Sequence, residues 1–306
     1  MIRVKNLRKQ FGDLKAVDGI TFDVADGEIF GFLGPNGAGK TTTIRILSCI
    51  IKPTMGNAYL NGYNVLDNPM EIRKMVGILT ENPCLYERLT PVYNLDFFGK
   101  LYEVPDTVRA QRIEEILRRF NLYDRKEEKV ETFSKGMKQK LALARSLLHN
   151  PKIIFLDEPT SALDPKTAKG VRDYIKELSE GSKHIIFVCT HNLTEAAYLC
   201  DRVAVIDHGR IVGIGSPEEL SRDIWKGERV EIILKNYNET MEQAIKNLGV
   251  IKSYEYQEPS LKIDVEDTSI ANPLIISTLV NAGAQIISAE VKKHSLEEVY
   301  LNLVRD

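Results

Sequence analysis

The sequence predicts an α/β domain that carries a helical insertion and is followed by a small α+β domain. Short apolar runs alternate with helical patterns from residue 1 to about 220, residues from about 84 to 150 show helical patterns only, and a new pattern begins after residue 215. With 306 residues the chain exceeds one typical domain but is short for two full-sized ones. We therefore expect domains at 1–220 and 228–306, with a helical subdomain at about 84–150.

Four short runs in the first part are apolar throughout, as are strands that are covered on both faces of a sheet. They span residues 29–33, 153–156, 185–189 and 203–206. The helical patterns between these runs predict crossover connections, and therefore a largely parallel sheet.

The helical insertion has its own start signal and periodicity. Thr90 and Pro91 offer an N-cap followed by proline at the first helical position. Residues 112–120 place apolar side chains at Ile113, Ile116 and Leu117, on one face of a helix.

The last part of the chain predicts a β-α-β-β-α-β order, which is typical of a ferredoxin-like unit. We expect strands at 229–234, 250–256, 261–265 and 285–291, helices at 239–248 and 273–281, and a closing helix at 295–303.

Composition excludes several classes of protein. Lys plus Arg number 41 and Asp plus Glu 43, so no strong overall charge attracts nucleic acid or an anionic membrane. The four cysteines form no C-x-x-C pair, which favours free thiols in a reducing, cytosolic compartment. No stretch reaches the roughly 18 apolar residues of a spanning helix, and residues 1–15 have no apolar h-region, so we expect neither a membrane span nor export.

A phosphate-binding loop follows the first buried strand and precedes a helical pattern, the context that the motif G-x-x-x-x-G-K-[ST] requires. The residues expected to contact a nucleotide here are Gly34, Pro35, Asn36, Gly37, Ala38, Gly39, Lys40, Thr41 and Thr42. Glycines let backbone amides surround an anion, Lys40 reaches the β- and γ-phosphates, and the Thr41 hydroxyl suits magnesium. The alternative is a glycine-rich turn that binds nothing.

Two acids end the apolar run that starts at residue 153. In phosphoryl-transfer enzymes this arrangement places Asp157 beside the metal ion and Glu158 next to the attacking water. The alternative is a buried strand whose acids begin a solvated loop.

Five further segments resemble motifs of the nucleotide-binding subunits of ABC transporters, which are P-loop NTPases. Residues 133–139 (FSKGMKQ) stand where that family has its L-S-G-G-Q signature, and residues 161–164 (SALD) match its D-loop. Thr190 and His191 match the switch histidine, Phe11 matches the adenine-stacking aromatic, and Glu81 falls at the Q-loop glutamine. The resemblance covers residues 1 to about 220.

The resemblance implies a site shared between two chains. Ser134, Lys135 and Gly136 would hold the γ-phosphate of ATP bound to the opposite subunit, and Asp164 would line the same interface. His191 would contact the γ-phosphate and help to fix Glu158 and the water. Structural alternatives stay open: Ser134 as a helix cap, His191 as a hydrogen-bonded structural residue, Phe11 as a core residue.

Two residues depart from the family pattern. Lys135 replaces the first signature glycine and puts a cation near the phosphate. Glu81 replaces an amide by a carboxylate, which still suits magnesium but adds a charge and loses a donor. We expect magnesium ligands at Thr41, Asp157 and Glu81.

In the family, a helix of the membrane subunit docks between the Q-loop and the helical insertion. Residues 82–90 would supply this surface, with Tyr86 and Leu89 as the best candidates. The aromatic and apolar residues nearby fit either a docking patch or the core of the insertion: Tyr93, Leu95, Phe97, Phe98 and Tyr102. The C-terminal segment from His294 (HSLEEVYLNL) resembles the accessory domain of the ABC-2 type branch, which exports drugs, antibiotics or ions.

These resemblances predict an ATP-binding and ATP-hydrolysing subunit that drives export through a separate permease. It would use ATP and Mg²⁺, form a homodimer or a heterodimer with a related ATPase in the ATP-bound state, and sit on the cytoplasmic face of the membrane. The alternative is a soluble ABC-type ATPase acting on DNA or ribosomes. Such proteins usually carry long coiled coils, zinc-binding cysteines or two cassettes, features that this sequence lacks. A nucleotide-gated structural protein is a third alternative, which the pair Glu158 and His191 disfavours.

Overall fold

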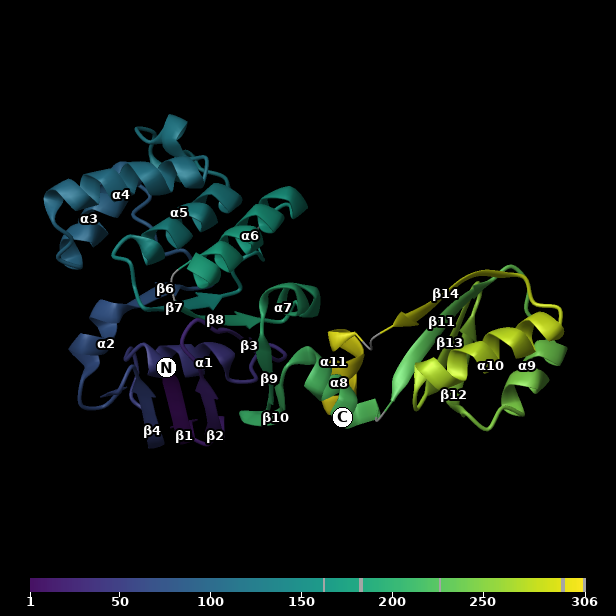
Figure 1. Cartoon of the computed structure of the whole chain (residues 1–306). Helices are drawn as coiled ribbons and strands as arrows, with labels where there is room; N and C mark the ends of the chain where they lie inside the picture. The colour runs from purple at the N-terminus through teal and green to yellow at the C-terminus, as the bar shows by residue number, and fades with distance from the viewer. Residues whose placement is uncertain (162, 182–183, 226, 293–294, 305–306) are drawn as a thin grey trace. The chain divides into compact units, whose positions relative to one another are not determined.

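The computed structural model describes residues 1–161, 163–181, 184–225, 227–292 and 295–304 (Figure 1). Ala162 of the expected D-loop and His294 lie outside the described residues. The chain divides into two compact units, 1–214 and 215–306, each with a hydrophobic core. The second unit begins earlier than residue 228, because α8 (Pro217–Trp225) packs against α11 (Leu296–Leu303).

A six-stranded sheet in the order β10-β9-β3-β8-β7-β6 forms the centre of the first unit. Its strands are β3 (Ile29–Leu33), β6 (Val76–Leu79), β7 (Ile153–Asp157), β8 (Ile185–Thr190), β9 (Arg202–Asp207) and β10 (Arg210–Gly215). β3 pairs in parallel with β8 and β9, and β7 pairs in parallel with β6 and β8. The predicted parallel sheet is confirmed, and the four predicted apolar runs all lie in it.

A second, antiparallel sheet has the order β2-β1-β4-β5 and was not predicted from the sequence. It comprises β1 (Ile2–Phe11), β2 (Leu14–Val24), β4 (Met55–Leu60) and β5 (Tyr63–Asn64). Ile2 and Val4 are buried while Arg3 and Lys5 are exposed, the alternation of a sheet covered on one face. This alternation was visible near the N-terminus, but the strands carry no chemical motif.

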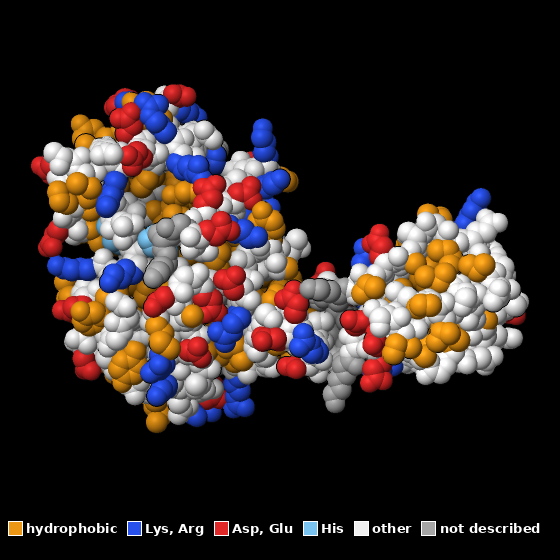
Figure 2. Space-filling model, viewed as in Figure 1, with side chains coloured by type: hydrophobic (Ala, Val, Ile, Leu, Met, Phe, Trp, Pro, Cys, Tyr) orange, Lys and Arg blue, Asp and Glu red, His pale blue; other side chains and the backbone are white. Residues whose placement is uncertain are grey.

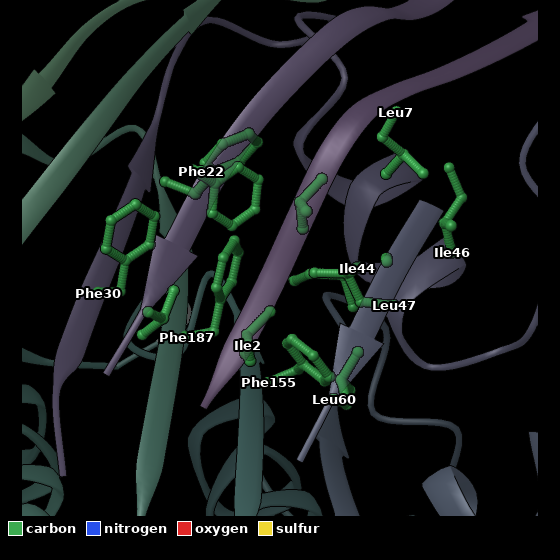
Figure 3. Packing of buried hydrophobic residues seen from close by; sticks show 14 of the residues in the cluster. Ile2, Leu7, Phe22, Phe30, Ile44, Ile46, Leu47, Leu60, Phe155 and Phe187 are labelled. Carbon is green, nitrogen blue, oxygen red and sulfur yellow. The ribbon is translucent and has the colours of Figure 1, made fainter. Parts of the chain in front are cut away.

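The main core of the first unit contains residues from both sheets and from α1 (Figure 3). The ring of Phe22 on β2 stacks on that of Phe30 on β3, with centroids 5.5 Å apart. Phe187 on β8 lies 5.6 Å from both Phe30 and Phe155. Burying such a side chain contributes roughly 1.5–3 kcal/mol each, so these aromatics fix the sheet beneath the polar loops at its strand ends.

Seven helices connect the strands of the first unit among its described residues. They are α1 (Lys40–Leu47), α2 (Pro69–Met75), α3 (Pro91–Leu101), α4 (Asp106–Arg119), α5 (Lys135–Leu147), α6 (Pro165–Gly181) and α7 (Leu193–Leu199), with 3-10 turns at Tyr123–Arg125 and Val130–Thr132. α3, α4 and α5 form the predicted helical insertion between β6 and β7. The Thr90 hydroxyl accepts a hydrogen bond from the backbone N–H of Tyr93, so the predicted cap of α3 is confirmed.

β6 lies against α5 with no side chain between them at Gly77. A Cβ atom at this position would lie 2.1 Å from the carbonyl oxygen of Ser146, a distance that backbone atoms do not tolerate. Glycine is therefore required here by close approach, not by its φ angle.

The second unit has the sheet order β12-β13-β11-β14, with antiparallel pairing throughout, as in a ferredoxin-like fold. Its strands are β11 (Glu228–Leu234), β12 (Ile251–Gln257), β13 (Ser260–Val265) and β14 (Ile286–Lys292), and its sheet-covering helices are α9 (Glu239–Lys246) and α10 (Thr268–Asn281). The expected start of α10 at Pro273 was wrong. Asp267 accepts from the backbone N–H of Ser269 and starts the helix earlier, so Pro273 lies inside it.

Positive and negative side chains are interspersed on the face of the first unit in Figure 2, with no large area of one sign. This agrees with the near balance of 41 basic and 43 acidic residues. Within the described ranges, no helix combines the length and apolar character needed to cross a membrane.

Candidate active site

The loop from residue 34 to 39 connects β3 to α1 and is pressed against its neighbours. A Cβ on Gly34 would lie 2.2 Å from the carbonyl oxygen of Ile206, and one on Gly39 would lie 2.3 Å from that of Ala16. Gly39 also has φ 109°, which disfavours any side chain. The loop is therefore built from glycine at both ends, and its backbone amides gather at the N-terminus of α1, a favourable place for an anion.

Lys40 is buried beside this loop. Its ammonium group donates to the carbonyl oxygens of Gly34 at 2.6 Å and Pro35 at 3.0 Å. These two bonds hold a positive charge over the loop, at the anion-binding end of α1.

Thr41 in the first turn of α1 meets the end of β7. Its hydroxyl donates to Oδ2 of Asp157 at 2.8 Å. The pKa of Asp157 is raised overall, mainly by burial. The Thr41 hydrogen bond and the charge of Lys40 lower it, whereas the negative charges of Glu158 and Glu81 raise it further. Acidic groups therefore crowd around Asp157, and a bound cation would relieve their repulsion.

Glu158 follows β7 with a positive φ of 53°, a conformation that is uncommon for a residue with a side chain. Its backbone N–H donates to the carbonyl oxygen of Cys189 at 2.9 Å. Its Oε1 receives a hydrogen bond from the backbone N–H of His191 at 3.0 Å, and Nδ1 of the same histidine lies 2.7 Å away. The hydroxyl of Thr190 donates to Oε2 at 3.3 Å. The carboxylate is thus fixed by groups at the end of β8.

Two residues that contact the segment after β7 were not predicted from the sequence to belong to the site. Gln139, buried on α5, directs Nε2 at the carbonyl oxygens of Glu158 and Pro159, each at 3.4 Å. Its place at the end of the signature-like segment was the only signal. Glu195 on α7 is 2% exposed and accepts from the hydroxyl of Thr160 at 2.5 Å. A glutamate in the first turn of a helix normally needs no further explanation, so the sequence did not single it out.

The residues of the signature-like segment lie at the N-terminus of α5. Ser134 caps α5 by accepting from the backbone N–H of Met137 at 3.3 Å, Lys135 is exposed, and Gly136 is half-buried. Asp164 similarly accepts from the backbone N–H of Thr167 at 3.0 Å, and hydrogen bonds from the side chain and the backbone of Thr167 lower the pKa of its carboxyl group. No described contact joins these side chains to the residues around Lys40.

Phe11 and Glu81 lie at the ends of strands. Phe11 ends β1, is 49% exposed and has Nζ of Lys9 at 4.8 Å from its ring centroid, so the alternative of a core residue was wrong. Glu81 is exposed beyond β6, and its charge contributes to the raised pKa of Asp157. Stacking of Phe11 on a base stays a prediction.

The aromatic residues near Tyr86 divide between surface and core. Leu95 is fully buried, whereas four side chains are at least one-third exposed: Tyr86, Leu89, Tyr93 and Phe97. The ring of Tyr86 packs on Phe97 and Phe98 at 5.2 and 5.9 Å. The side chain of buried Asn94 accepts a hydrogen bond from the backbone N–H of Tyr86 and donates one to its carbonyl oxygen. These two bonds fix the backbone of Tyr86 at this exposed surface.

Together these groups can hold a polyphosphate, a cation and an attacking water. The loop and Lys40 supply positive potential, while Glu158 offers a carboxylate that is held in place. Among the described residues, no three His, Cys, Asp or Glu side chains are arranged to hold a metal ion by themselves. A cation here would therefore depend on phosphate oxygens as well as on Thr41 and Asp157.

Comparison with known families finds two matches along the chain. Residues 17–161 match the family described as "ABC transporter". Residues 215–304 match the family described as "ATP-binding protein DrrA1-3-like, C-terminal domain".

Curated relatives cover nearly the whole chain. It is 32% identical over 306 residues to the linearmycin resistance ATP-binding protein LnrL of Bacillus subtilis (strain 168), covering 99% of this chain and 98% of the relative. It is 34% identical over 306 residues to the daunorubicin resistance ATP-binding protein DrrA3 of Streptomyces coeruleorubidus, covering 100% and 96%.

A solved structure matches the larger unit's fold. It is described as the dimeric structure of a post-hydrolysis state of the ATP-binding cassette MJ0796 bound to ADP and Pi. The TM-score is 0.66 at 28% identity, and the match covers 71% of this chain and 98% of that one.

Proposed function

Because this chain belongs to the ABC transporter family of ATP-binding proteins, we propose that it drives export through a separate membrane permease. The chain is an ATPase of that family. The observation that supports ATP hydrolysis as the driving reaction is the position of Glu158, held by Thr190 and His191 one residue beyond the Thr41–Asp157 pair. The names of LnrL and DrrA3 refer to resistance, which favours export and disfavours a soluble ATPase of DNA or ribosomes.

The nucleotide would lie along the loop between β3 and α1. Backbone amides and Lys40 would bind the phosphates, and Phe11 would stack on adenine. The residues proposed to form this pocket are Gly34, Pro35, Asn36, Gly37, Ala38, Gly39, Lys40, Thr41 and Thr42. The bonds from Lys40 to two loop carbonyls support this assignment, because they place its charge where phosphate oxygens would gather.

The site also fits Mg²⁺. The hydroxyl of Thr41 and the carboxylates of Asp157 and Glu81 are hard oxygen donors, and burial, together with the charges of Glu158 and Glu81, raises the pKa of Asp157. When bound, the ion would neutralise charge on the β- and γ-phosphates. Thr41 would be a direct ligand, with Asp157 and Glu81 completing the oxygen environment.

Glu158 would act as the general base for hydrolysis. The water oxygen attacks the γ-phosphorus, the bond to the β,γ-bridging oxygen breaks, and a proton of the water passes to Glu158, giving ADP and phosphate. His191 would hold Oε1 of Glu158 and contact the γ-phosphate. Its side chain is 60% exposed, which leaves the ring accessible to a nucleotide.

A second subunit would complete the site. Ser134, Lys135, Gly136 and Asp164 of one chain would meet the γ-phosphate bound by the other, in a homodimer or a heterodimer with a related ATPase. The bonds of Ser134 and Asp164 to their own helices present two helix N-termini, where an anion is favoured. The dimeric cassette of similar fold supports this proposal.

The exposed surface around Tyr86 and Leu89 is the proposed docking site for the permease. This contact would hold the chain at the cytoplasmic face of the membrane, with no role for nucleic acid. The second unit, expected to span 228–306 as an accessory domain, would serve the same export system, because the match to this chain covers 98% of LnrL and 96% of DrrA3.

The decisive experiment replaces Glu158 by glutamine in the purified full-length chain. Glu158→Gln should lower kcat about 10²- to 10⁴-fold, because the amide cannot accept the proton, while ATP binding is kept. Size-exclusion chromatography with light scattering should then detect an ATP-bound dimer. Glu127→Gln, at an exposed glutamate of the insertion, is the matched control. Hydrolysis by Glu158→Gln at the wild-type rate would exclude the proposed base.

The partner is tested separately. Affinity purification of the full-length chain from native membranes should recover a multi-span protein. Recovery of ribosomes or DNA in its place would reject the transporter assignment.

A further inference from the structure

Glu195 is a buried acid close to the proposed catalytic centre, and the mechanism above does not use it. It lies in the first turn of α7, and its backbone N–H donates to the side chain of Asn192, the cap of that helix. Its carboxyl group accepts from the Thr160 hydroxyl at 2.5 Å and is also hydrogen-bonded to Thr190. Thr160 follows β7 and Thr190 ends β8, so Glu195 joins the two strand ends between which Glu158 lies.

The hydroxyl of Thr190 has one proton to give and two acids to receive it. Its oxygen accepts from the backbone N–H of Asn192 at 3.0 Å, and it donates to Oε2 of Glu158 at 3.3 Å. A hydroxyl has one donor and two acceptor positions. If Glu195 is ionised, it competes with Glu158 for the Thr190 proton. If Glu195 is protonated, it donates to the second acceptor position of Thr190, and every group in the chain is satisfied.

The surroundings of Glu195 favour the protonated form. Burial raises the pKa of Glu195, hydrogen bonds from Thr160 and Thr190 lower it, and the negative charge of Glu158 raises it. The net direction is upward. Arg172 on α6 is the cation that opposes this trend, and the buried thiol of Cys200 is the other titratable neighbour.

We propose that Glu195 is a positioning residue that, as a neutral acid, directs the Thr190 hydroxyl toward Glu158. The hydrogen-bond chain runs from Glu195 through Thr190 to Oε2 of Glu158, while the Thr160 hydroxyl donates to Oε1 of Glu195. The inference rests on the proposed role of Glu158 as the base. Its consequence is that Glu195 acts on kcat and not on ATP affinity, because it touches neither the loop nor Lys40 in the described contacts.

The test compares Glu195→Gln with Glu195→Ala in the purified full-length chain. Glutamine keeps an uncharged donor and acceptor, so kcat at neutral pH should stay within about twofold of wild type. Alanine removes the partner of the Thr160 hydroxyl and the group that orients the Thr190 hydroxyl, so kcat should fall about 10- to 100-fold with the Kd for ATP unchanged. Equal losses in both variants, or full activity in Glu195→Ala, would overturn the proposal.

A pH profile separates this role from a merely structural one. As pH rises through the elevated pKa of Glu195, the wild-type acid ionises and captures the Thr190 proton, whereas glutamine cannot titrate. The ratio of wild-type kcat to Glu195→Gln kcat should therefore fall with rising pH. A ratio that stays constant from neutral to alkaline pH would show that the proton of Glu195 has no part.

Variants of Thr190 keep the test independent of whether Glu195→Ala folds. Thr190→Val preserves shape but removes the hydroxyl, so it should lower kcat, whereas Thr190→Ser keeps the hydroxyl and should restore most of it. Thermal unfolding of each variant verifies folding. If the wild-type chain does not hydrolyse ATP, the proposed function fails; if it does and Thr190→Val matches Thr190→Ser in kcat, only this inference fails.

Discussion

Oε1 of Glu158 receives the backbone N–H of His191 at 3.0 Å and lies 2.7 Å from Nδ1 of the same residue. One histidine thus holds one carboxylate oxygen twice. Nδ1 donates to this carboxylate only when it carries a proton, and Nε2 donates to a phosphate oxygen only when the ring is an imidazolium. The backbone of His191 would still hold Glu158 if the ring were removed, so the two contributions can be tested separately.

Replacing His191 by alanine removes the ring but keeps the backbone hydrogen bond. We expect kcat for ATP to fall about 10- to 100-fold, less than in Glu158→Gln, because Glu158 stays present but loses one fixed donor. Steady-state hydrolysis with a parallel ATP-binding titration measures this. His208→Ala, at an exposed histidine, is the control and should leave kcat unchanged. A full loss of ATP binding in His191→Ala would contradict an orienting role.

Replacing Glu81 by glutamine tests whether this residue acts on magnesium. Burial raises the pKa of Asp157 and the negative charge of Glu81 adds to this, and the Glu81 carboxylate is a harder metal ligand than an amide. We expect Glu81→Gln to shift the Mg²⁺ concentration for half-maximal hydrolysis upward by about threefold or more. Glu87→Gln, an exposed acid of the same loop region, should show the wild-type curve. An unchanged magnesium profile in Glu81→Gln would argue against a ligand role.

His149 gives the fold a predictable sensitivity to acid. Burial lowers the pKa of His149 to about 4, although its bond to the carbonyl of Val76 opposes this shift. In the unfolded chain the pKa of His149 is near 6.5. Between pH 4 and 6.5 the unfolded chain therefore binds more protons at His149 than the folded chain does. Stability contributed by neutral His149 is therefore present above pH 6.5 and lost as pH falls toward 4, by up to about 3 kcal/mol.

His149→Gln keeps a donor for the Val76 carbonyl but cannot titrate in this range. Chemical unfolding at a series of pH values should show a shallower loss of stability between pH 6.5 and 4 than in wild type. His208→Gln should keep the wild-type slope. The same slope in His149→Gln and wild type would mean that another group causes the acid sensitivity.

Charges on the surface around Tyr86 should weaken permease binding without changing basal hydrolysis. Leu89 and Tyr93 are 38% and 63% exposed, so glutamate is tolerated at both positions while opposing an apolar contact. We expect Leu89→Glu and Tyr93→Glu to reduce recovery of the chain with membranes by about tenfold. Leu101→Glu lies at the other end of α3, is 66% exposed in the wild type, and should remain membrane-bound. Equal loss in all three variants would exclude a localised docking site.

Much of the fold could be predicted, because its strands carry strong local signals. The all-apolar runs of β3, β7 and β8 are typical of doubly covered strands, and they marked the parallel sheet. The antiparallel sheet was missed because its strands show only alternation, and β1 carries three register shifts in its pairing with β2 that disturb this pattern. The start of α10 was misplaced because a proline was taken as a first helical residue while the cap lay at Asp267.

The candidate site was predictable only where chemistry leaves a motif. Lys40, Thr41 and Glu158 stand in spacings that the reaction itself requires. Glu195 and Gln139 were not identified, since their importance arises from burial and from partners distant in the sequence. Each of these two residues matters because of a contact with a residue far away in the sequence. Such contacts cannot be predicted from a single sequence.

Gly77 has a mechanical meaning as well as a steric one. With backbone against backbone, β6 and α5 have no compressible side-chain layer between them at this point. β6 leads to Glu81, and α5 begins after its cap Ser134. In the proposed export cycle, a displacement at Glu81 would therefore pass to α5 through this backbone contact.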